Sequence, residues 1–189
     1  MGHAGAPRPI VVRNLADVTF TPMGQRLLPQ NLIDLYAHSL AIEREAFKRF
    51  IELERFMRDV GMDHIADEFE KIGKEEQEQY EALAVGTAER TLPALEGWEY
   101  AWHYLGPDAD RVNAPKNARD AIKLALATER RAQNFYVDVA EHANDDAVCA
   151  FAAEMAADEQ RHVTRLEQLL AREPEPAKSA DEDAEILRR

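Results

Sequence analysis

The sequence carries the stretch Glu159-Gln160-Arg161-His162 near its carboxyl end, and a similar stretch, Glu76-Gln77-Glu78-Gln79, in its first half. Residues three positions apart share a face of a helix, so Glu159 and His162 can point toward one place. Each stretch follows a helical segment with its own inward-facing glutamate, Glu129 before the Glu159 stretch and Glu43 before the Glu76 stretch. The pattern therefore predicts four helices that turn four carboxylates and an imidazole toward a common centre.

Apolar residues recur at helical spacing in four segments around these glutamates. The first segment runs from an N-cap at Asn31 to near Gly61, and the second begins at a cap at Asp63. The third spans about 117–142, and the fourth follows the turn at 144–146. A short turn makes consecutive helices antiparallel neighbours. We therefore expect an all-α, antiparallel four-helix bundle over 31–171, built from two similar helical hairpins.

Three other segments do not follow this pattern. Residues 1–30 contain four prolines and predict an N-terminal arm. Residues 85–117 are rich in glycine, proline and aromatic residues, and predict a long crossover between the hairpins with one short helix over 95–104. Residues 172–189 form a charged stretch of the kind that is disordered.

Composition excludes several classes of function. The chain has 23 Lys and Arg against 36 Asp and Glu, a net charge of −13, which disfavours nucleic acid and anionic membranes as partners. No apolar run is long enough for a membrane span, and no signal peptide is recognisable. A single cysteine, Cys149, excludes a disulfide framework and favours the cytoplasm.

The four glutamates interrupt apolar stripes at matched heights in the two hairpins. Buried carboxylates are costly unless they take up protons, pair with cations or bind metal. Two divalent ions would balance four carboxylates with a neutral His162, so metal binding explains the set better than a metal-free polar layer. Carboxylate and imidazole donors suit iron or manganese, and zinc can occupy the same kind of site.

Each glutamate has an expected role in a centre with two irons, the arrangement known for four-helix bundles of this type. We expect Glu43 and Glu129 to be terminal ligands, one from each hairpin. Glu76 and Glu159 would bridge the two metals, and His162 would complete the shell of one of them.

Gln79 occupies the position at which the second stretch would carry a histidine. An amide oxygen is a weak neutral ligand, so the two metal positions should be unequal. Gln79 is equally well explained as a polar residue hydrogen-bonded to Glu76 or to water.

The other candidates are weaker. His38 lies on a different face from Glu43 and is expected to be exposed, as is His64. His103, in the crossover, is the only histidine that could swing in to replace the missing ligand. Tyr136 is expected to pack in the core, with hydrogen bonding or radical chemistry as alternatives.

Over residues 31–171 the chain resembles the ferritin-like superfamily, and within it the rubrerythrin-like proteins. The resemblance rests on the Gly61 turn, Ile65-Ala66, Phe69, Glu76-x-x-Gln79 and Glu159-x-x-His162. It implies a non-haem di-iron centre that reduces hydrogen peroxide, and a homodimer. Gln79 and Ala132 depart from the family pattern, which has a histidine and a glutamate there. With one cysteine the chain lacks the rubredoxin domain of rubrerythrins proper, so its electrons are expected from a separate donor protein.

Several functions fit these observations. The leading one is a di-iron peroxidase or ferroxidase with Glu76 and Glu159 as catalytic residues. The alternative is a metal-binding protein whose degenerate or mononuclear site has no turnover. A metal-free scaffold and a substrate hydroxylase are the remaining hypotheses.

Overall fold

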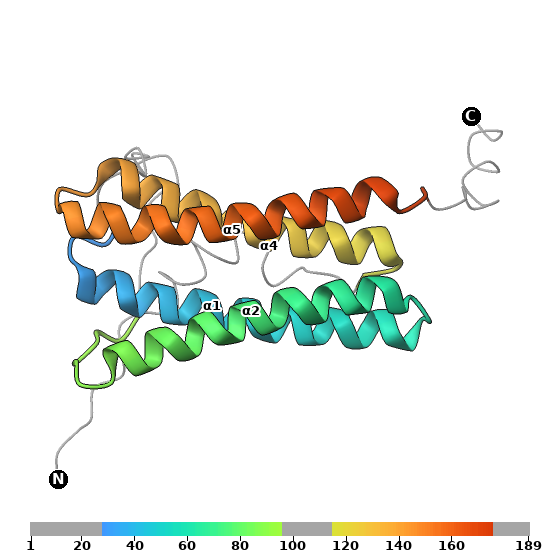
Figure 1. Cartoon of the computed structure of the whole chain (residues 1–189), viewed down its shortest axis with the longest axis horizontal. Helices are drawn as coiled ribbons and strands as arrows, with labels where there is room; N and C mark the ends of the chain where they lie inside the picture. The colour runs from blue at the N-terminus through green and yellow to red at the C-terminus, as the bar shows by residue number, and fades with distance from the viewer. Residues whose placement is uncertain (1–27, 96–114, 176–189) are drawn as a thin grey trace, which may run out of the picture.

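A computed structural model describes residues 28–95 and 115–175 of the chain. These two ranges contain four α-helices and no strands: α1 (Leu32–Asp59), α2 (Asp63–Thr87), α4 (Ala118–His142) and α5 (Asp146–Arg172). Helices α1 and α2 pack together as one hairpin, and α4 and α5 as the second, and the two hairpins lie one over the other (Figure 1). The predicted all-α four-helix bundle is confirmed.

Three helices begin at a side-chain cap. The Asn31 side chain accepts a hydrogen bond from the backbone N–H of Asp34 at the start of α1, and Asn117 accepts one from Asp120 at the start of α4. At α5, the Asp145 carboxylate accepts from the N–H groups of the first turn. These bonds satisfy N–H groups that the helices cannot satisfy themselves.

The turn between α1 and α2 follows a glycine C-cap. Gly61 has a φ of +73°, a conformation that glycine adopts without steric cost. Its N–H donates to the Arg58 carbonyl, and the Met62 N–H donates to the Met57 carbonyl, which together close a Schellman motif. The prediction that Asp63 caps α2 is wrong. Met62 holds the cap position without a side-chain hydrogen bond, and Asp63 is the first helical residue.

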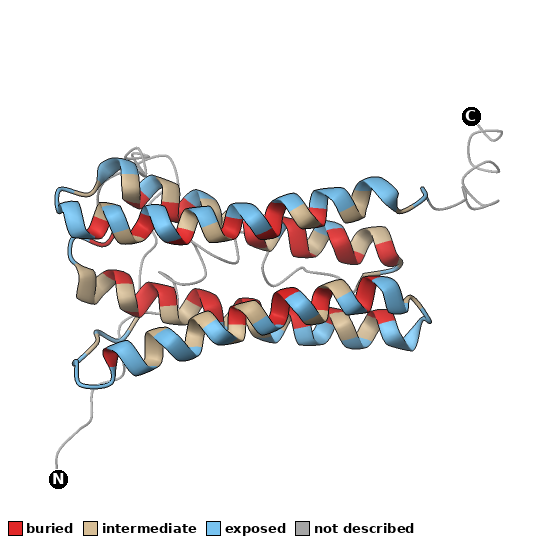
Figure 2. Ribbon diagram, in the orientation of Figure 1, coloured by how far each residue is buried: buried red, intermediate tan, exposed pale blue. Residues whose placement is uncertain are grey.

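Two apolar clusters fill the bundle, and the four glutamates lie between them. One cluster comprises Phe50, Leu53, Met57 and the residues that pack with them, and the other includes Leu35, Ile42, Phe135 and Val139. In every helix the buried glutamate separates residues on these two sides. The buried faces of all four helices turn inward (Figure 2). The carboxylates therefore form a polar layer inside an otherwise apolar bundle.

Helices α1 and α2 approach each other closely at Gly73. A Cβ atom at this position would lie 3.0 Å from the Cβ of Phe50. Because Phe50 is itself buried and anchored to the α1 backbone, the contact could be relieved only by moving a helix. The close packing of the two helices therefore favours glycine at this position.

Several predictions concern other parts of the chain. The N-terminal arm, the short helix of the crossover, His103 and the charged tail lie wholly or mostly outside the described residues. Within those residues, no helix combines the length and apolar character needed to cross a bilayer.

Candidate metal centre

Each helix contributes one glutamate to the polar layer: Glu43 from α1, Glu76 from α2, Glu129 from α4 and Glu159 from α5. All four are at most 1% exposed, and so is His162, one turn beyond Glu159 on α5. Glu76, Glu129, Glu159 and His162 each place a possible ligand atom within 4.8 Å of the others. The structure thus brings these four predicted residues into one cluster.

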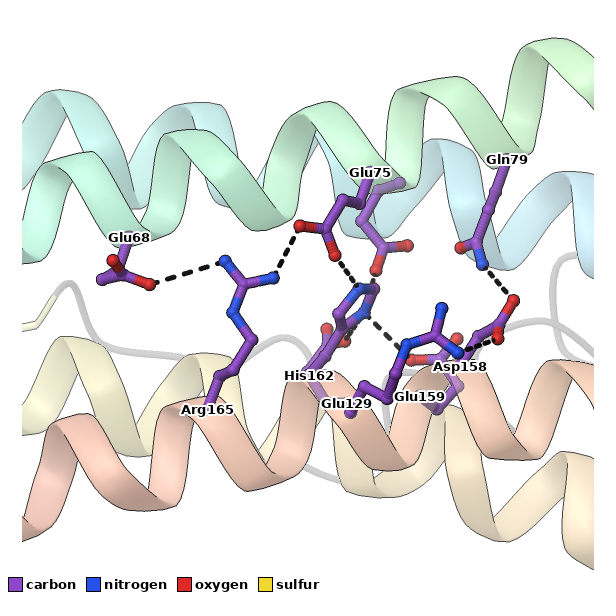
Figure 3. A network of polar contacts seen from close by, with 10 residues as sticks. Glu68, Glu75, Gln79, Glu129, Asp158, Glu159, His162 and Arg165 are labelled. Carbon is purple, nitrogen blue, oxygen red and sulfur yellow. Dashed lines mark hydrogen bonds and ion pairs between the residues drawn. The ribbon is translucent and has the colours of Figure 1, made fainter.

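The His162 ring lies across the middle of the cluster (Figure 3). Its Nδ1 is 2.6 Å from Glu76 Oε1, 3.2 Å from Glu129 Oε2 and 3.9 Å from Glu159 Oε2. The bond to Glu129 has hydrogen-bonding geometry. One ring nitrogen therefore faces three carboxylates.

Glu43 stands slightly apart from this group. Its Oε1 accepts a hydrogen bond of 2.8 Å from the Tyr136 hydroxyl, and both side chains are buried. Tyr136 therefore combines the packing role expected from the sequence with a hydrogen bond to a candidate ligand. The bond holds the Glu43 carboxyl from the α4 side of the layer.

Burial governs the protonation of the layer. It raises the pKa of Glu43 from 4.5 to about 7, while interactions with Glu76 and Tyr136 oppose the shift. Burial and the nearby Glu129 carboxylate raise the pKa values of Glu76 and Glu159 well above 4.5. Burial alone would lower the pKa of His162, but its contacts with Glu129 and Glu75 raise it above 6.5. The carboxyl groups of Glu43, Glu76 and Glu159 therefore keep their protons to higher pH than exposed glutamates do.

Gln79 turns toward a neighbouring helix. Its Nε2 donates to Asp158 Oδ2 on α5 at 2.8 Å (Figure 3), whereas the sequence suggested Glu76 or water as its partner. Both residues also line a cavity of about 300 Å³ between α1, α2 and α5, whose apolar walls include Tyr36, Leu83, Phe151 and Met155. Gln79 thus links α2 to α5 next to the carboxylate layer. We call the line along which these two helices face each other the α2–α5 seam.

Glu75 was not recognised from the sequence. Its Oε2 accepts a hydrogen bond of 3.0 Å from His162 Nε2, and its Oε1 accepts one of 2.6 Å from Arg165 Nη1. Burial would raise the pKa of Glu75, but Arg165 and His162 outweigh this and lower it. Glu75 is therefore a carboxylate that contacts the histidine from outside the cluster.

Two other histidines of the described residues, His38 and His64, do not belong to the cluster, and one of them requires a correction. His38 is buried at 7% exposure, and its ring centroid lies 5.6 Å from that of Phe135. The prediction that it is exposed is wrong, because the face of α1 that carries it packs against α4. His64 is exposed, as predicted, and pairs with Glu173 at 3.5 Å.

The donor set fits divalent metal ions. Six buried carboxylate oxygens of the four glutamates accept no hydrogen bond: Glu43 Oε2, Glu76 Oε1 and Oε2, Glu129 Oε1, and Glu159 Oε1 and Oε2. Of these, Glu76 Oε1 lies within ion-pair distance of His162 Nδ1. Buried polar atoms are normally satisfied, so this many unsatisfied acceptors at one place fit a binding site for cations. Oxygen donors with one imidazole nitrogen are the ligands that iron and manganese take in proteins.

The fold and this site define a ferritin-like four-helix-bundle protein with a buried carboxylate–histidine cluster. A family model described as rubrerythrin matches residues 34–170, and the chain belongs to the rubrerythrin family. Among curated proteins, none matches the chain.

Two solved structures are similar to the bundle. An uncharacterized conserved protein from Magnetospirillum magnetotacticum MS-1 shares 25% identity with a TM-score of 0.70, over 79% of this chain and 99% of that one. The bacterioferritin-related protein from Bacteroides fragilis, described as a dodecameric thioferritin, shares 21% identity with a TM-score of 0.57. That match covers 74% of this chain and 83% of the other, and it supports the fold alone.

Proposed function

We propose that this protein is a non-haem di-iron oxidoreductase that reacts with hydrogen peroxide or dioxygen, as a peroxidase or ferroxidase. The observation that carries the proposal is the set of six unsatisfied carboxylate oxygens in a layer that also holds the imidazole of His162. Two iron ions would bring four positive charges to four carboxylates. Membership of the rubrerythrin family supports the same chemistry.

The proposed ligands divide by their place in the bundle. Glu76 and Glu159 come from the helices that face each other across the seam, α2 and α5, and are proposed to bridge the metals. Glu43 and Glu129 are the proposed terminal ligands, and His162 would hold one metal through Nδ1, the ring nitrogen that faces the carboxylates. When bound, the two irons would each supply one electron to the O–O bond of the oxidant.

The protein's own groups would control the protons and the solvent of this reaction. Burial of the layer between two apolar clusters excludes bulk water from it. The Tyr136 hydroxyl keeps Glu43 oriented by donating to its Oε1. Since burial raises the pKa of Glu43 to about 7 without metal, metal binding must displace protons from the layer.

A second candidate is a metal-binding protein with one tightly held ion and no turnover. The tight cluster comprises Glu76, Glu129, Glu159 and His162, without Glu43. Gln79, the remaining possible ligand, donates its amide N–H to Asp158. The Gln79 carbonyl oxygen is a weak neutral ligand. A second metal ion that depends on it would therefore be held less tightly than the first.

Metal stoichiometry and peroxide consumption distinguish the two functions. The protein would be loaded anaerobically with Fe(II), analysed for iron and mixed with peroxide while its near-ultraviolet absorption is followed. Two irons per chain and rapid Fe(II)-dependent peroxide loss support the di-iron enzyme, whereas one iron without turnover supports the binding protein. A protein that takes up no metal would refute both and leave a scaffold.

Matched variants test the assignment of the ligands. Glu76→Ala and Glu159→Ala should abolish Fe(II)-dependent peroxide consumption. Glu78→Ala, at an exposed position of the same helix as Glu76, should leave it unchanged. Unchanged turnover in both ligand variants would rule out the proposed centre.

The assembly and its electron supply are part of the same proposal. We propose that the unit of residues 31–171 forms a homodimer in the cytoplasm and receives electrons from a separate donor protein. The similar B. fragilis protein is described as a dodecamer. A measurement of the molecular mass in solution would therefore distinguish a dimer of this chain from a dodecamer.

A further inference from the structure

The polar network of His162 continues beyond the carboxylate layer (Figure 3). The two ring nitrogens face different surroundings, since Nδ1 lies among the carboxylates of the layer and Nε2 is 3.0 Å from Glu75 Oε2. The His162 side chain is 1% exposed, whereas that of Glu75 is 43% exposed. Glu75 therefore contacts the ring from the solvent side of the α2–α5 seam.

The ring has one donor and one acceptor nitrogen when it is neutral, and only the acceptor can bind a metal. A carboxylate at one nitrogen keeps the proton there and leaves the lone pair on the other. The same contact fixes the rotation of the ring about its own bonds. Glu75 is placed to keep the proton on Nε2, which leaves Nδ1 free to bind.

The guanidinium group of Arg165 in turn fixes the position of Glu75. Arg165 Nη1 donates to Glu75 Oε1 at 2.6 Å, while its Nη2 donates to Glu68 Oε2 at 3.4 Å. Arg165 lies on α5, and both glutamates lie on α2, so the arginine joins the two helices. The two oxygens of Glu75 have separate tasks, one toward the arginine and one toward the imidazole.

We propose that Glu75 is a positioning residue, which holds His162 with Nε2–H toward itself and Nδ1 toward the carboxylate cluster, and that Arg165 holds Glu75 in place. This inference rests on the proposed metal-binding function. It adds a residue that does not itself contact the metal. It also predicts that metal affinity depends on a partly exposed glutamate outside the polar layer.

Metal affinity tests the proposal in the full-length chain, with Zn(II) and Co(II) as probes. Glu75→Ala should weaken binding about 10- to 100-fold, the usual loss when the carboxylate behind a ligating histidine is removed. Glu75→Gln retains a hydrogen-bond acceptor but no charge and should fall between Glu75→Ala and the wild type.

The matched control is Glu68→Ala. It removes an equal charge from the same helix and the same arginine but does not touch His162. Its effect should stay within about fivefold, the range of an exposed charge pair. If Glu68→Ala lowered the metal affinity as much as Glu75→Ala, the effect would come from the loss of a negative charge and not from the contact with His162. That result would overturn the proposal.

A second measurement reports on the ring directly. Long-range ¹H–¹⁵N NMR spectra of the Zn(II)-loaded protein, labelled in histidine, show which nitrogen carries the proton. In the wild type, His162 should show a protonated, slowly exchanging Nε2 and a metal-bound Nδ1. In Glu75→Ala, the Nε2 proton should exchange faster.

The two proposals fail in different ways. If the wild type binds neither Zn(II) nor Co(II), the proposed metal function is refuted, and the role of Glu75 falls with it. If the wild type binds tightly and Glu75→Ala matches it in affinity and in Nε2–H exchange, only the role of Glu75 is refuted.

Discussion

The metal-free protein should lose stability as the pH rises from 5 to 8. The pKa of Glu43 gives the size of one contribution to this loss in the free energy of unfolding. Its pKa is 4.5 in an exposed setting and about 7 in the folded protein, because burial disfavours the charged form. Below pH 4.5 the group is protonated in both states, and its contribution to stability is fully present. Between pH 4.5 and 7 the unfolded chain releases the proton while the folded one retains it, so unfolding becomes more favourable. At 1.36 kcal/mol per pKa unit, the loss from Glu43 alone is about 3 kcal/mol.

Other groups of the layer act in the same direction. The pKa values of Glu76 and Glu159 are raised by burial, and that of His162 is raised by Glu129 and Glu75 despite burial. Each raised pKa contributes stability at low pH that disappears as the pH rises through the folded-state value. A typical domain has about 5–15 kcal/mol of stability, so the loss is a large share of the total.

Urea unfolding of EDTA-treated protein, followed by circular dichroism at pH 5 and pH 8, measures this loss. Glu43→Gln removes the titration but keeps an oxygen that can accept from Tyr136, so its stability should change by about 2.5 kcal/mol less than that of the wild type between pH 5 and pH 8. Glu78→Gln, at an exposed position, removes the same charge and controls for the net charge of the chain. The reasoning would be refuted by equal stability of the metal-free wild type at both pH values, or by equal pH dependence in Glu43→Gln and the wild type.

Four further predictions concern metal binding and packing. At pH 7.5, a divalent ion at 100 times its Kd should stabilise the protein by about 2.7 kcal/mol, seen as a rise in Tm, with a smaller rise at pH 5, where protons compete. Gly73→Ala should destabilise the fold by about 1–3 kcal/mol through the close approach of α1, whereas Gly86→Ala, with open space around its Cβ, should be neutral or stabilising by up to about 1 kcal/mol in urea unfolding. Tyr136→Phe removes the hydroxyl that donates to Glu43, so metal-free protein should lose about 1–2 kcal/mol at pH 8 in the same assay. Gln79→His should raise the iron content toward two tightly held ions per chain by elemental analysis, and unchanged stoichiometry would show that this position does not limit the second site.

Apolar periodicity, together with cap and turn residues, predicted the four helices and their inward-facing glutamates. An inward-facing glutamate in an apolar stripe is visible in a sequence because its neighbours at helical spacing are apolar. Glu129 and Glu159 were recognised in this way, and the structure buries both. The three-residue spacing of Glu159 and His162 likewise predicted that they share a face.

Contacts between helices could not be predicted from the same pattern. Glu75 is one of 36 acidic residues, and its importance arises only because α5 brings His162 and Arg165 opposite to it. His38 lies beside the main apolar stripe of α1, so its burial depends on how closely α4 approaches. These features depend on the rotation of each helix about its axis, which a single sequence specifies poorly.

The C-terminal end of α2, which borders the cavity beside Gln79, is less firmly packed than the rest of the helix. Helix α2 buries five residues before Glu76, but after Glu76 it buries only Thr87. Segments with few buried contacts open at low free-energy cost. The last three turns of α2 should therefore separate from α5 more readily than the rest of the bundle. The Gln79–Asp158 hydrogen bond joins the two helices there and would have to break first. We therefore expect small molecules and ions to reach the layer from this end of α2 and not through the apolar cluster around Phe50.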